Sequence, residues 1–385
     1  MTMLLYDNKK SVEEIFSKQE KHSSINIDLN NSSLFLSENF TVLSGLLKSD
    51  LKGQVDLIYI DPPFNTNQNF TVDLERASSI SRSANGYLAY SDQMSLAEYL
   101  EFIRERLFLL RELLSPVGSL YLHIDYKIGH YIKIICDEVF GRDNFKNDIS
   151  RIKSNPKNFK RKAYGNQKDM ILFYAKNSNI NIFNDISLEL DNFDIKNMFK
   201  KIDKNGRRYT TVPAHAPGET KDGPTGAKWR DMSPPPGRHW RQNPLLLDEL
   251  DKIGRIEWSK NGVPRIINYA DEHKGKKIQD IWYYIDPQYP SYPTEKNLNM
   301  LEFIIKQSSN VNSIVLDCFV GGGTTLLAAN NLKRRWIGID TSIVAINAIM
   351  KRIVLYPFDF YEYDYNDKIY KMTFQDNNNL FTSEK

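Results

Sequence analysis

The chain has 385 residues, of which 41% are hydrophobic and 26% charged, and its formal net charge is only +3 at pH 7. This length and composition are ordinary for a globular protein of two or three domains with a large core. Its two cysteines, Cys136 and Cys318, are too few for a disulfide framework or a four-ligand zinc site, and its six histidines show no metal-ligand spacing, so we expect no metal. No apolar run approaches the roughly 20 residues that span a bilayer, and residues 1–10 lack the profile of a signal peptide, so we expect a cytoplasmic protein without membrane contact.

The first 176 residues alternate between predicted strands and helices. In order, the predicted elements are a strand at 34–36, a helix at 41–47, a strand at 55–60, a helix at 95–114, a strand at 119–124, a helix at 127–140 and a strand at 170–175. Ser95 and Glu98 form a capping box at the start of the longest helix, and Pro116 and Gly118 are predicted to end it. The polar stretch 65–94 is long enough to be a lid, a binding loop or a disordered segment. The alternation favours an α/β fold with a doubly wound, mostly parallel sheet.

The middle of the chain differs in composition and pattern, because proline and glycine cluster between Pro213 and Gly237 and helical periodicity fades. The α/β pattern then resumes, with a helix at 298–307, a strand at 313–316, a helix at 324–334, a strand at 336–339 and a helix at 342–352. We therefore predict that residues 1–176 and 288–385 form one α/β domain and that residues 177–287 are a loop-rich domain inserted into it.

A glycine-rich turn at residues 321–323 follows the predicted strand at 313–316 and opens the next helix. Glycine permits positive φ values and lets a ligand approach the backbone closely. Asp340 ends the next predicted strand, about 20 residues beyond the turn, where an acidic side chain can bind the hydroxyl groups of a ribose. A tight turn without any ligand explains this pattern equally well.

The same turn argues against a phosphate ligand. Thr324 directly follows Gly323, so the Gly-Lys-Ser/Thr of a Walker A loop is absent. Leu326 stands where a dinucleotide-binding fingerprint needs a small residue. A nucleoside without phosphates fits better, and S-adenosylmethionine is the common one.

The second informative segment, Asp61-Pro62-Pro63-Phe64, follows the apolar strand predicted at 55–60. An isolated aspartate at such a place is usually a helix cap or a buried, hydrogen-bonded acid. The two prolines remove two N–H donors and hold Asp61 extended. The Asp61 carboxylate and the Pro62 carbonyl can then accept both hydrogens of an exocyclic amino group, while the Phe64 ring stacks on its base.

These residues resemble the motifs of amino-group DNA methyltransferases. Asp-Pro-Pro-Phe is similar to their catalytic motif, the segment 317–325 (Asp-Cys-Phe-Val-Gly-Gly-Gly-Thr-Thr) to their cofactor motif, and the segment 292–297 (Tyr-Pro-Thr-Glu-Lys-Asn) to the sequence before it. Cys318, Gly322 and Asn297 depart from the usual Pro, Ser and Pro. The catalytic motif precedes the cofactor motif, which is the permuted order of the β group of N6-adenine methyltransferases. Segments 229–230, 237–241 and 280–282 further resemble modification subunits of type III-like restriction systems.

The resemblance implies a Rossmann-like, circularly permuted methyltransferase fold with an inserted target recognition domain. It also implies a role for each residue of the motifs. The catalytic residues would be Asp61, Pro62, Pro63 and Phe64. The residues binding S-adenosylmethionine would be Asp61, Lys296, Asp317, Phe319, Gly321, Gly323, Thr324, Thr325 and Asp340. Residues 37–39 (Ser-Glu-Asn) resemble a Gly-Asp-Asn segment of the family imperfectly and are not predicted to belong to the site.

The expected reaction is transfer of a methyl group from S-adenosylmethionine to N6 of a flipped-out adenine in double-stranded DNA. Methylation of cytosine N4 is the nearest alternative, although those enzymes usually begin the catalytic motif with serine. A non-catalytic DNA-binding subunit that retains the fold is the alternative from another class. Whether a cognate restriction endonuclease or a second copy of the chain also binds stays open.

DNA is expected to contact a basic stretch at residues 146–168, where lysines and arginines far outnumber acids. The residues predicted to contact the DNA backbone there are Lys153, Lys157, Lys160, Arg161 and Lys162. In the inserted domain, Arg230, Arg238 and Arg241 are candidates for contacts with base edges, because arginine pairs with guanine through two hydrogen bonds. Each of these residues is equally compatible with an ordinary solvated surface.

Overall fold

The computed structural model describes residues 3–63, 69–72, 87–91, 94–156, 160, 162–288, 290, 292, 295–353, 356–363 and 369–372. The chain divides into two compact units, one formed by Met1–Asp185 with Gln279–Lys385 and the other by Ile186–Ile278. The second unit lies within the segment 177–287 that the sequence predicts as an insertion. None of the helices within the described ranges is long and apolar enough to cross a membrane.

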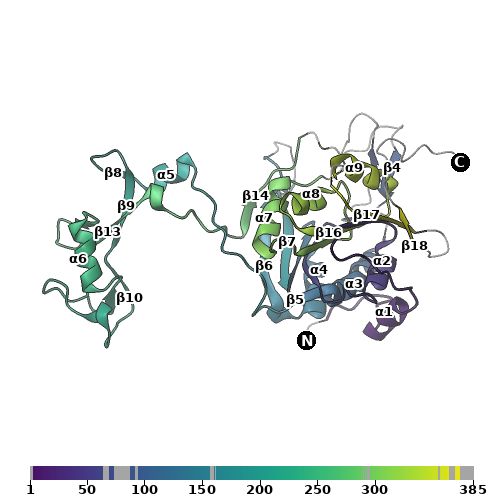
Figure 1. The fold of residues 1–385 in the computed structure, drawn as a ribbon, viewed down its shortest axis with the longest axis horizontal. Coiled ribbons are helices and arrows are strands. Elements are labelled where there is room, and N and C mark those ends of the chain that lie inside the picture. The colour runs from purple at the N-terminus through teal and green to yellow at the C-terminus, as the bar shows by residue number, and fades with distance from the viewer. Residues whose placement is uncertain are drawn as a thin grey trace. The chain divides into compact units, whose positions relative to one another are not determined.

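The first unit is built on a mixed, mostly parallel sheet of ten strands (Figure 1). Its strands, in their order across the sheet, are β14 (Ile281–Tyr283), β6 (Phe145–Ile152), β7 (Lys168–Ala175), β5 (Leu114–Ile124), β2 (Val55–Ile60), β15 (Ile314–Asp317), β16 (Arg335–Asp340), β1 (Ser33–Leu36), β17 (Asp359–Tyr363) and β18 (Ile369–Met372). The central strands are apolar and buried on both faces, as expected of parallel strands covered by helices.

Helices cover both faces of this sheet (Figure 1). One face carries α1 (Val12–Gln19), α2 (Asn39–Leu46), α3 (Leu96–Leu113) and α4 (Gly129–Phe140), and the other carries α7 (Leu298–Ser308), α8 (Thr324–Asn331) and α9 (Ile343–Ile353). Ser95 caps α3 through the capping box with Glu98 that the sequence predicts. The predicted α/β, doubly wound architecture is confirmed.

The two predicted motifs lie side by side at one edge of the sheet. Strand β2 pairs in parallel with β15, with Leu57 opposite Val315, and β15 pairs in parallel with β16. On the far side of β16, Leu36 of β1 lies opposite Asp340. Because these four strands run in the same direction, the residues that follow them meet at the same edge, which we call the carboxyl edge.

One part of the sheet differs from the parallel pattern that the alternation favours. Strand β7 runs antiparallel to β5 and β6, and β6, which was not predicted as a strand, includes the first residues of the basic stretch 146–168. Its cationic side chains conceal its alternating pattern: Ile149 and Arg151 are buried, whereas Lys146 and Asp148 are less so. Residues 116–118 continue β5 and do not form a turn.

A further helix and a pair of strands were also not predicted. Helix α1 is short and strongly polar, with Ile15 and Gln19 as its buried residues. Inside the polar stretch 65–94, the described residues include an antiparallel pair of strands, β3 (Asn69–Val72) and β4 (Tyr87–Ser91).

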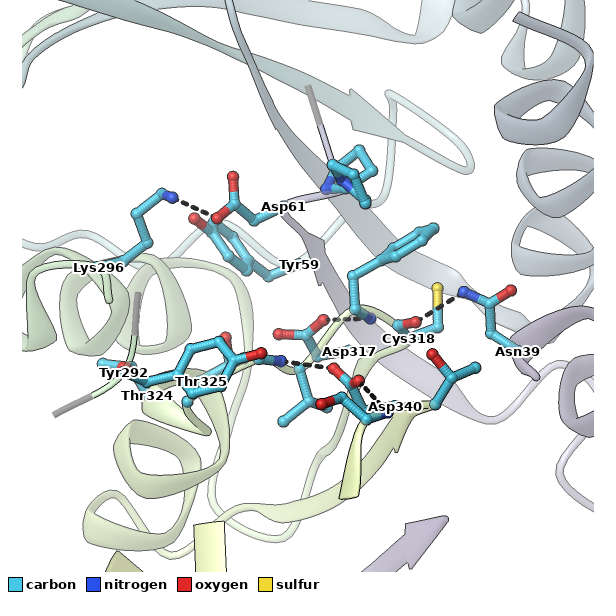
Figure 2. Close-up of a pocket in the computed structure, with 18 of the residues that line it drawn as sticks. Asn39, Tyr59, Asp61, Tyr292, Lys296, Asp317, Cys318, Thr324, Thr325 and Asp340 are labelled. Atoms are coloured by element: carbon cyan, nitrogen blue, oxygen red, sulfur yellow. Dashed lines mark hydrogen bonds and ion pairs between the residues drawn. The ribbon is translucent and has the colours of Figure 1, made fainter. Parts of the chain in front are cut away.

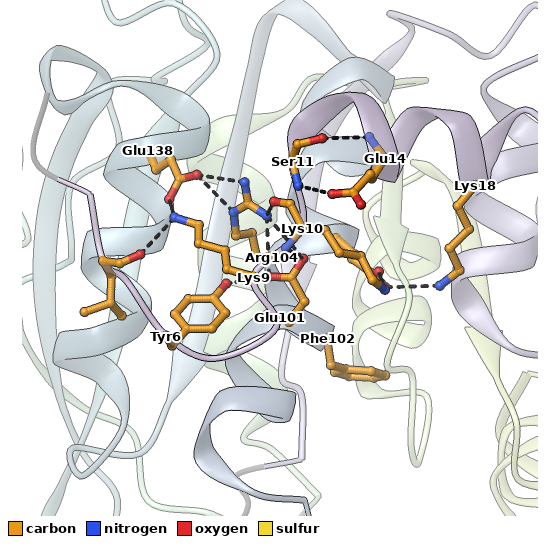
Figure 3. A network of polar contacts seen from close by, with 12 residues as sticks. Tyr6, Lys9, Lys10, Ser11, Glu14, Lys18, Glu101, Phe102, Arg104 and Glu138 are labelled. Atoms are coloured by element: carbon orange, nitrogen blue, oxygen red, sulfur yellow. Dashed lines mark hydrogen bonds and ion pairs between the residues drawn. The ribbon is translucent and has the colours of Figure 1, made fainter.

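Polar contacts join the N-terminal segment to helices α3 and α4 (Figure 3). Lys9 pairs with Glu138 at 2.7 Å, and Arg104 pairs with the same carboxylate at 2.9 Å. The hydroxyl of Tyr6 donates to Glu101 at 2.6 Å. Arg104 is almost completely buried, so it depends on these partners, since an unpaired buried charge is costly. The network fixes helix α3, whose Phe102 reaches the carboxyl edge.

The second unit has its own small core and more regular structure than the sequence predicts. Its elements are α5 (Asn192–Met198), β8 (Lys201–Ile202), β9 (Arg208–Pro213), β10 (His215–Pro217), β11 (Arg238–Trp240), α6 (Pro244–Lys252), β12 (Ile256–Trp258) and β13 (Pro264–Tyr269). Strands β12, β13, β9 and β8 form one antiparallel sheet and β10 pairs with β11. Trp229, Trp240 and Leu247 form the centre of the core. Most of these strands are too short for hydrophobic periodicity to predict them.

Candidate active site

A cavity of about 320 Å³ lies at the carboxyl edge of the first unit (Figure 2). Its walls are the residues that follow four neighbouring strands: 37–39 after β1, 61–63 after β2, 318–322 after β15 and 341–342 after β16. This size is within the usual range for small-molecule sites, and the position is the one at which open α/β sheets bind ligands.

Most of the residues that the sequence assigns to catalysis and cofactor binding line this cavity. They are Asp61, Pro62, Pro63, Lys296, Asp317, Phe319, Gly321, Thr324, Thr325 and Asp340. Gly323 does not line the cavity but is the residue that precedes helix α8. Phe64 lies outside the described residues. Two motifs separated by some 250 positions therefore line one cavity.

The glycine turn takes its shape from the two buried aspartates beside it. Gly321 has a φ of 52° and Gly323 a φ of 76°, values that favour glycine. Asp340 accepts hydrogen bonds from the backbone N–H of Gly321 at 2.8 Å and of Ser342 at 2.9 Å. Asp317 accepts one from the N–H of Phe319 at 2.9 Å. These acids therefore hold the loop in place besides being available to a ligand.

Burial changes the acidity of both aspartates. Burial raises the pKa of Asp317 to about 7, opposed by hydrogen bonds from Phe319 and Thr325. It raises the pKa of Asp340 to about 6, opposed by backbone hydrogen bonds. A ligand with positive charge or hydroxyl donors would favour the ionised form of both groups.

Several residues of the site were not predicted. Asn39 Nδ2 donates to the carbonyl oxygen of Cys318 at 2.9 Å, and Arg106 pairs with Glu38. The strand that precedes residues 37–39 neighbours β16, a fact that the sequence does not reveal. In the sequence, the imperfect resemblance of residues 37–39 to Gly-Asp-Asn was the signal that could have placed them in the site.

The segment before helix α7 also approaches the glycine turn. A Cβ atom on Gly322 would lie 2.7 Å from Cβ of Tyr292, so the absence of the usual serine makes room for this ring. Arg352 Nη1 donates to the Gly322 carbonyl at 2.7 Å, and Nη2 pairs with Glu295 at 2.9 Å. Arg352, on α9, thus joins this segment to the turn.

Asp61 lies between the cofactor turn and the β5–β7 side of the sheet. Its Oδ2 atom pairs with Lys296, whose side chain is mostly buried (Figure 2). Its Oδ1 atom is buried and has no hydrogen-bond partner among the described residues. Pro62 is buried and supplies no N–H donor. Within the described part of the chain, Asp61 Oδ1 is therefore an acceptor without a donor, in the cavity that the glycine turn also lines.

The basic stretch turns at the same edge of the sheet. Ile124 at the end of β5 lies opposite Met170 of β7, and Ile152 at the end of β6 lies opposite Lys168, so the β6–β7 connection is at the carboxyl edge. Of the predicted DNA contacts there, Lys160 and Lys162 are exposed. Lys153 pairs with Asp169 at 2.5 Å. Lys157 and Arg161 lie outside the described residues.

The predicted arginines of the second unit differ in their partners. Arg230 pairs with Asp248 at 3.0 Å and with Asp251 at 2.5 Å. Arg238 is exposed, with Nη1 3.3 Å from His215 Nδ1. Arg241 is exposed and donates from Nε to the carbonyl of Pro213 at 3.0 Å. Arg238 and Arg241 therefore direct more of their donors to solvent than Arg230 does.

Comparison with known protein families decides what kind of site this is. The family model described as DNA methylase matches residues 55–351, from strand β2 to helix α9. The chain belongs to this DNA methylase family. The match includes both motifs and the whole second unit.

Known relatives of the methylase include a type II methyltransferase and the Mod subunit of a type III restriction-modification enzyme. It is 39% identical over 330 residues to the type II methyltransferase M.EcaI of Enterobacter cloacae, covering 84% of this chain and 70% of the relative. It is 25% identical over 369 residues to the Mod subunit of the type III restriction-modification enzyme StyLTI of Salmonella typhimurium, covering 87% and 55%. The solved M1.HpyAVI–SAM complex shares 19% identity, with a TM-score of 0.43, over 83% of this chain and 98% of the other.

The cavity suits the cofactor that this family uses. A methylase needs a methyl donor, and S-adenosylmethionine combines a nucleoside with positive charge and carries no phosphate. The cavity offers buried carboxylates for hydroxyl and cationic groups, a glycine turn without a Walker lysine, and the flat ring of Phe319. S-adenosylmethionine is therefore the cofactor of the methylase, as predicted.

Proposed function

We propose that this DNA methylase transfers the methyl group to N6 of adenine, at a specific site in double-stranded DNA. The observation that carries the proposal is Asp61 Oδ1, a buried acceptor for which the described residues supply no donor, in the cavity that the glycine turn also lines. The acidic first residue of the catalytic motif favours adenine N6 over cytosine N4, whose enzymes resemble this chain but usually have serine there.

The target amino group would be activated by two acceptors. The lone pair of adenine N6 is delocalised into the ring, so the nitrogen is a poor nucleophile. Asp61 and the Pro62 carbonyl would accept its two hydrogens and favour a tetrahedral nitrogen with a localised lone pair. Phe64 would stack on the flipped base, in place of the neighbouring bases of the duplex. Lys296, bound to Asp61 Oδ2, would orient the carboxylate.

The cofactor would be held by the residues around the glycine turn. Asp340 would accept hydrogen bonds from the ribose hydroxyls, while Asp317, Phe319, Gly321, Thr324 and Thr325 would surround the rest of the molecule. When bound, S-adenosylmethionine supplies an electrophilic methyl group on a sulfonium centre. The chain then has to bring the amino nitrogen into line with that group, and correct placement alone can supply much of the rate.

DNA would bind across the carboxyl edge of the first unit. Lys160 and Lys162, with Lys157 and Arg161, would contact phosphates from the β6–β7 connection. The second unit would read the sequence, with Arg238 and Arg241 as the favoured base contacts and Arg230 held by its acidic partners. Relatives named as a type II methyltransferase and a type III Mod subunit support a cognate restriction endonuclease as partner. A homodimer stays a prediction.

Identification of the product tests the proposal. Purified enzyme is incubated with a DNA library and methyl-labelled S-adenosylmethionine, the DNA is digested to nucleosides, and the labelled nucleoside is identified by mass spectrometry. We expect N6-methyladenine at one short sequence motif. N4-methylcytosine as the main product would overturn the base assignment and leave the family and the cofactor unchanged.

A further inference from the structure

Four side chains behind Asp61 form a buried hydrogen-bond chain across the sheet. Strands β2, β5, β7 and β6 are adjacent. The Tyr59 hydroxyl of β2 lies 2.9 Å from Nδ1 of His123, which is on β5. His123 Nε2 lies 3.3 Å from Oδ2 of Asp169, on β7. Lys153, which directly follows β6, donates to the other oxygen of Asp169 at 2.5 Å. Tyr59, His123 and Asp169 are buried.

The acceptor at the far end of this chain decides where the hydrogens lie. Burial opposes the ionisation of Asp169, but the hydrogen bonds and charges of His123 and Lys153 hold the pKa of Asp169 below its usual range. An ionised carboxylate can only accept hydrogen bonds. His123 Nε2 must therefore carry a hydrogen. A carboxylate that accepts from one ring nitrogen in this way selects the tautomer of the imidazole.

The other ring nitrogen is consequently without a hydrogen. Burial lowers the pKa of His123, against the hydrogen bond with Asp169 and the charge of Asp61, so the ring is neutral near pH 7. A neutral imidazole with its hydrogen on Nε2 has a lone pair on Nδ1. That lone pair accepts the hydrogen of the Tyr59 hydroxyl. Each hydrogen bond between Lys153 and Tyr59, through Asp169 and His123, then has an assigned donor and acceptor.

This arrangement has a consequence for Asp61. His123 Nδ1 lies 4.0 Å from Asp61 Oδ1, the atom that has no hydrogen-bond partner in the described part of the chain. A hydrogen on Nδ1 would be drawn to this carboxylate oxygen, and a small approach would complete the bond. A bare Nδ1 cannot donate, so Oδ1 remains available.

We propose that His123 is a positioning residue which, held by Asp169 with its hydrogen on Nε2, keeps Asp61 Oδ1 open for a hydrogen of the substrate's amino group. The role toward the substrate rests on the proposed function, whereas the tautomer does not. Among the described residues, the charged or titratable groups that face His123 include Tyr59 and Asp61 from β2 and the residue after it, Asp169 from β7, and Lys296 from the segment before α7. Arg151 of β6 lies 3.7 Å from Oδ2 of Asp169. Protonation of His123 in acid would place a hydrogen on Nδ1 and close the acceptor.

Nuclear magnetic resonance of the wild-type chain tests the tautomer directly. The protein is labelled with ¹⁵N in its six histidines, and His123 is assigned by the loss of its signals in His123→Gln. At pH 7.5 we expect Nε2 to give the signal of a nitrogen that carries hydrogen and Nδ1 that of a bare nitrogen. A hydrogen on Nδ1, or a doubly protonated ring at this pH, would overturn the proposal.

The Asp169→Asn variant tests the consequence for catalysis. The new amide can donate to Nε2, which moves the ring hydrogen to Nδ1. We expect kcat to fall about 10- to 100-fold, the scale on which outer hydrogen-bond partners act. The Kd for the cofactor should stay within about two-fold, because the lining of the cavity does not change. DNA affinity is no control here, because Asp169 also pairs with Lys153, a predicted DNA contact. General damage to the fold would instead weaken cofactor binding and lower Tm together with kcat. An unchanged kcat in Asp169→Asn would overturn the proposal.

Two control variants and a comparison with Asp61→Ala distinguish a failure of the role of His123 from a failure of the proposed function. His130→Gln on α4 and Asp143→Asn after it replace exposed residues and should leave kcat unchanged. Retained transfer by Asp61→Ala would overturn the proposed function together with the role of His123. Loss of transfer in Asp61→Ala with a normal kcat in Asp169→Asn would overturn the role of His123 alone.

Discussion

At the scale of single residues, three aspartates that end neighbouring strands have different surroundings. Asp61, after β2, has a side chain 16% exposed and an ion pair with Lys296. Asp317 and Asp340 accept backbone hydrogen bonds and have pKa values raised by burial. Asp61 is thus paired with a cation, whereas burial makes Asp317 and Asp340 weaker acids, so a positively charged ligand would favour the ionised forms of these two.

The raised pKa values predict that cofactor binding releases protons. Asp317 titrates at about 7 and Asp340 at about 6 in the free protein. The positive charges and hydroxyls of S-adenosylmethionine favour the ionised forms and so lower both pKa values. Affinity should therefore rise as pH increases from about 5.5 to about 7.5 and then level off. Titration calorimetry at pH 6.5 in buffers of different ionisation enthalpy should detect the released protons, and a pH-independent Kd without proton exchange would contradict the assignment.

The stability of the free protein should depend on pH in the opposite direction. A carboxyl whose folded pKa is raised stabilises the fold fully below its unfolded pKa, and this contribution is lost as pH rises through the folded pKa. The contribution of Asp317 and Asp340 therefore falls between about pH 4 and 7. The difference in Tm between wild type and Asp340→Asn, measured from pH 5 to 8, should shift in favour of the variant at high pH. A difference in Tm that does not vary with pH would count against a raised pKa.

At the scale of elements, the connection between β15 and α8 builds the cofactor side of the cavity. Gly323 must take a left-handed φ before α8 begins. A Cβ atom there would also lie 2.7 Å from Cγ1 of Ile349 on α9. The turn is therefore constrained both by its own backbone and by a neighbouring helix.

Gly323→Ala should destabilise the protein more than a left-handed φ alone explains. Gly53→Ala is the matched control, because Gly53 has a φ of 73° and no atom within 4 Å of a Cβ. Gly53→Ala should cost about 1–2 kcal/mol of unfolding free energy, with cofactor Kd unchanged. Gly323→Ala should cost more and weaken cofactor binding, since the turn has to move. Equal losses in the two variants, by denaturant unfolding and calorimetry, would show that the contact with Ile349 is unimportant.

The strands and helices that carry the two motifs could be predicted because their physical signals are local. Apolar runs before Asp61 and Asp317, a capping box at Ser95 and glycines at positive φ each act within a few residues. Strand β6 could not be predicted, since its alternation is hidden by lysines and arginines that find partners only after folding, as Arg151 does with Asp286.

The contacts behind Asp61 could not be read from the sequence either. Tyr59, His123 and Asp169 meet only because β2, β5 and β7 are neighbours with a particular register. The antiparallel direction of β7 sets that register, whereas the α/β alternation favoured a parallel strand at this place. Residues 37–39 reached the cavity for the same reason, through the pairing of β1 with β16.

At the scale of the whole molecule, the cavity and the basic β6–β7 connection lie at the same edge of the sheet. The ends of β1, β2, β15 and β16 line the cavity, and the β6–β7 connection with Lys160 and Lys162 lies at the same edge. Lys52 and Lys333 precede β2 and β16 and so belong to the opposite edge. The chain therefore provides cationic side chains on both edges, and only one edge is expected to face DNA.

Salt dependence should distinguish the two edges. Lys160→Gln combined with Lys162→Gln should weaken specific and non-specific DNA binding alike and reduce the slope of log Kd against log salt by up to about 2. The control, Lys52→Gln with Lys333→Gln, removes the same charge from the opposite edge and should leave the slope unchanged. Equal slopes in both variants, measured by fluorescence anisotropy, would contradict binding at the carboxyl edge.

In the proposed mechanism, Asp61 accepts the hydrogens of the target amino group next to a cofactor held by other residues. The most direct test is single-turnover methyl transfer by Asp61→Ala with saturating labelled S-adenosylmethionine, on the DNA that the wild type modifies. We expect no detectable transfer, with a cofactor Kd within several-fold of wild type because Asp317 and Asp340 remain in place. Transfer at a rate near that of the wild type would contradict this role of Asp61.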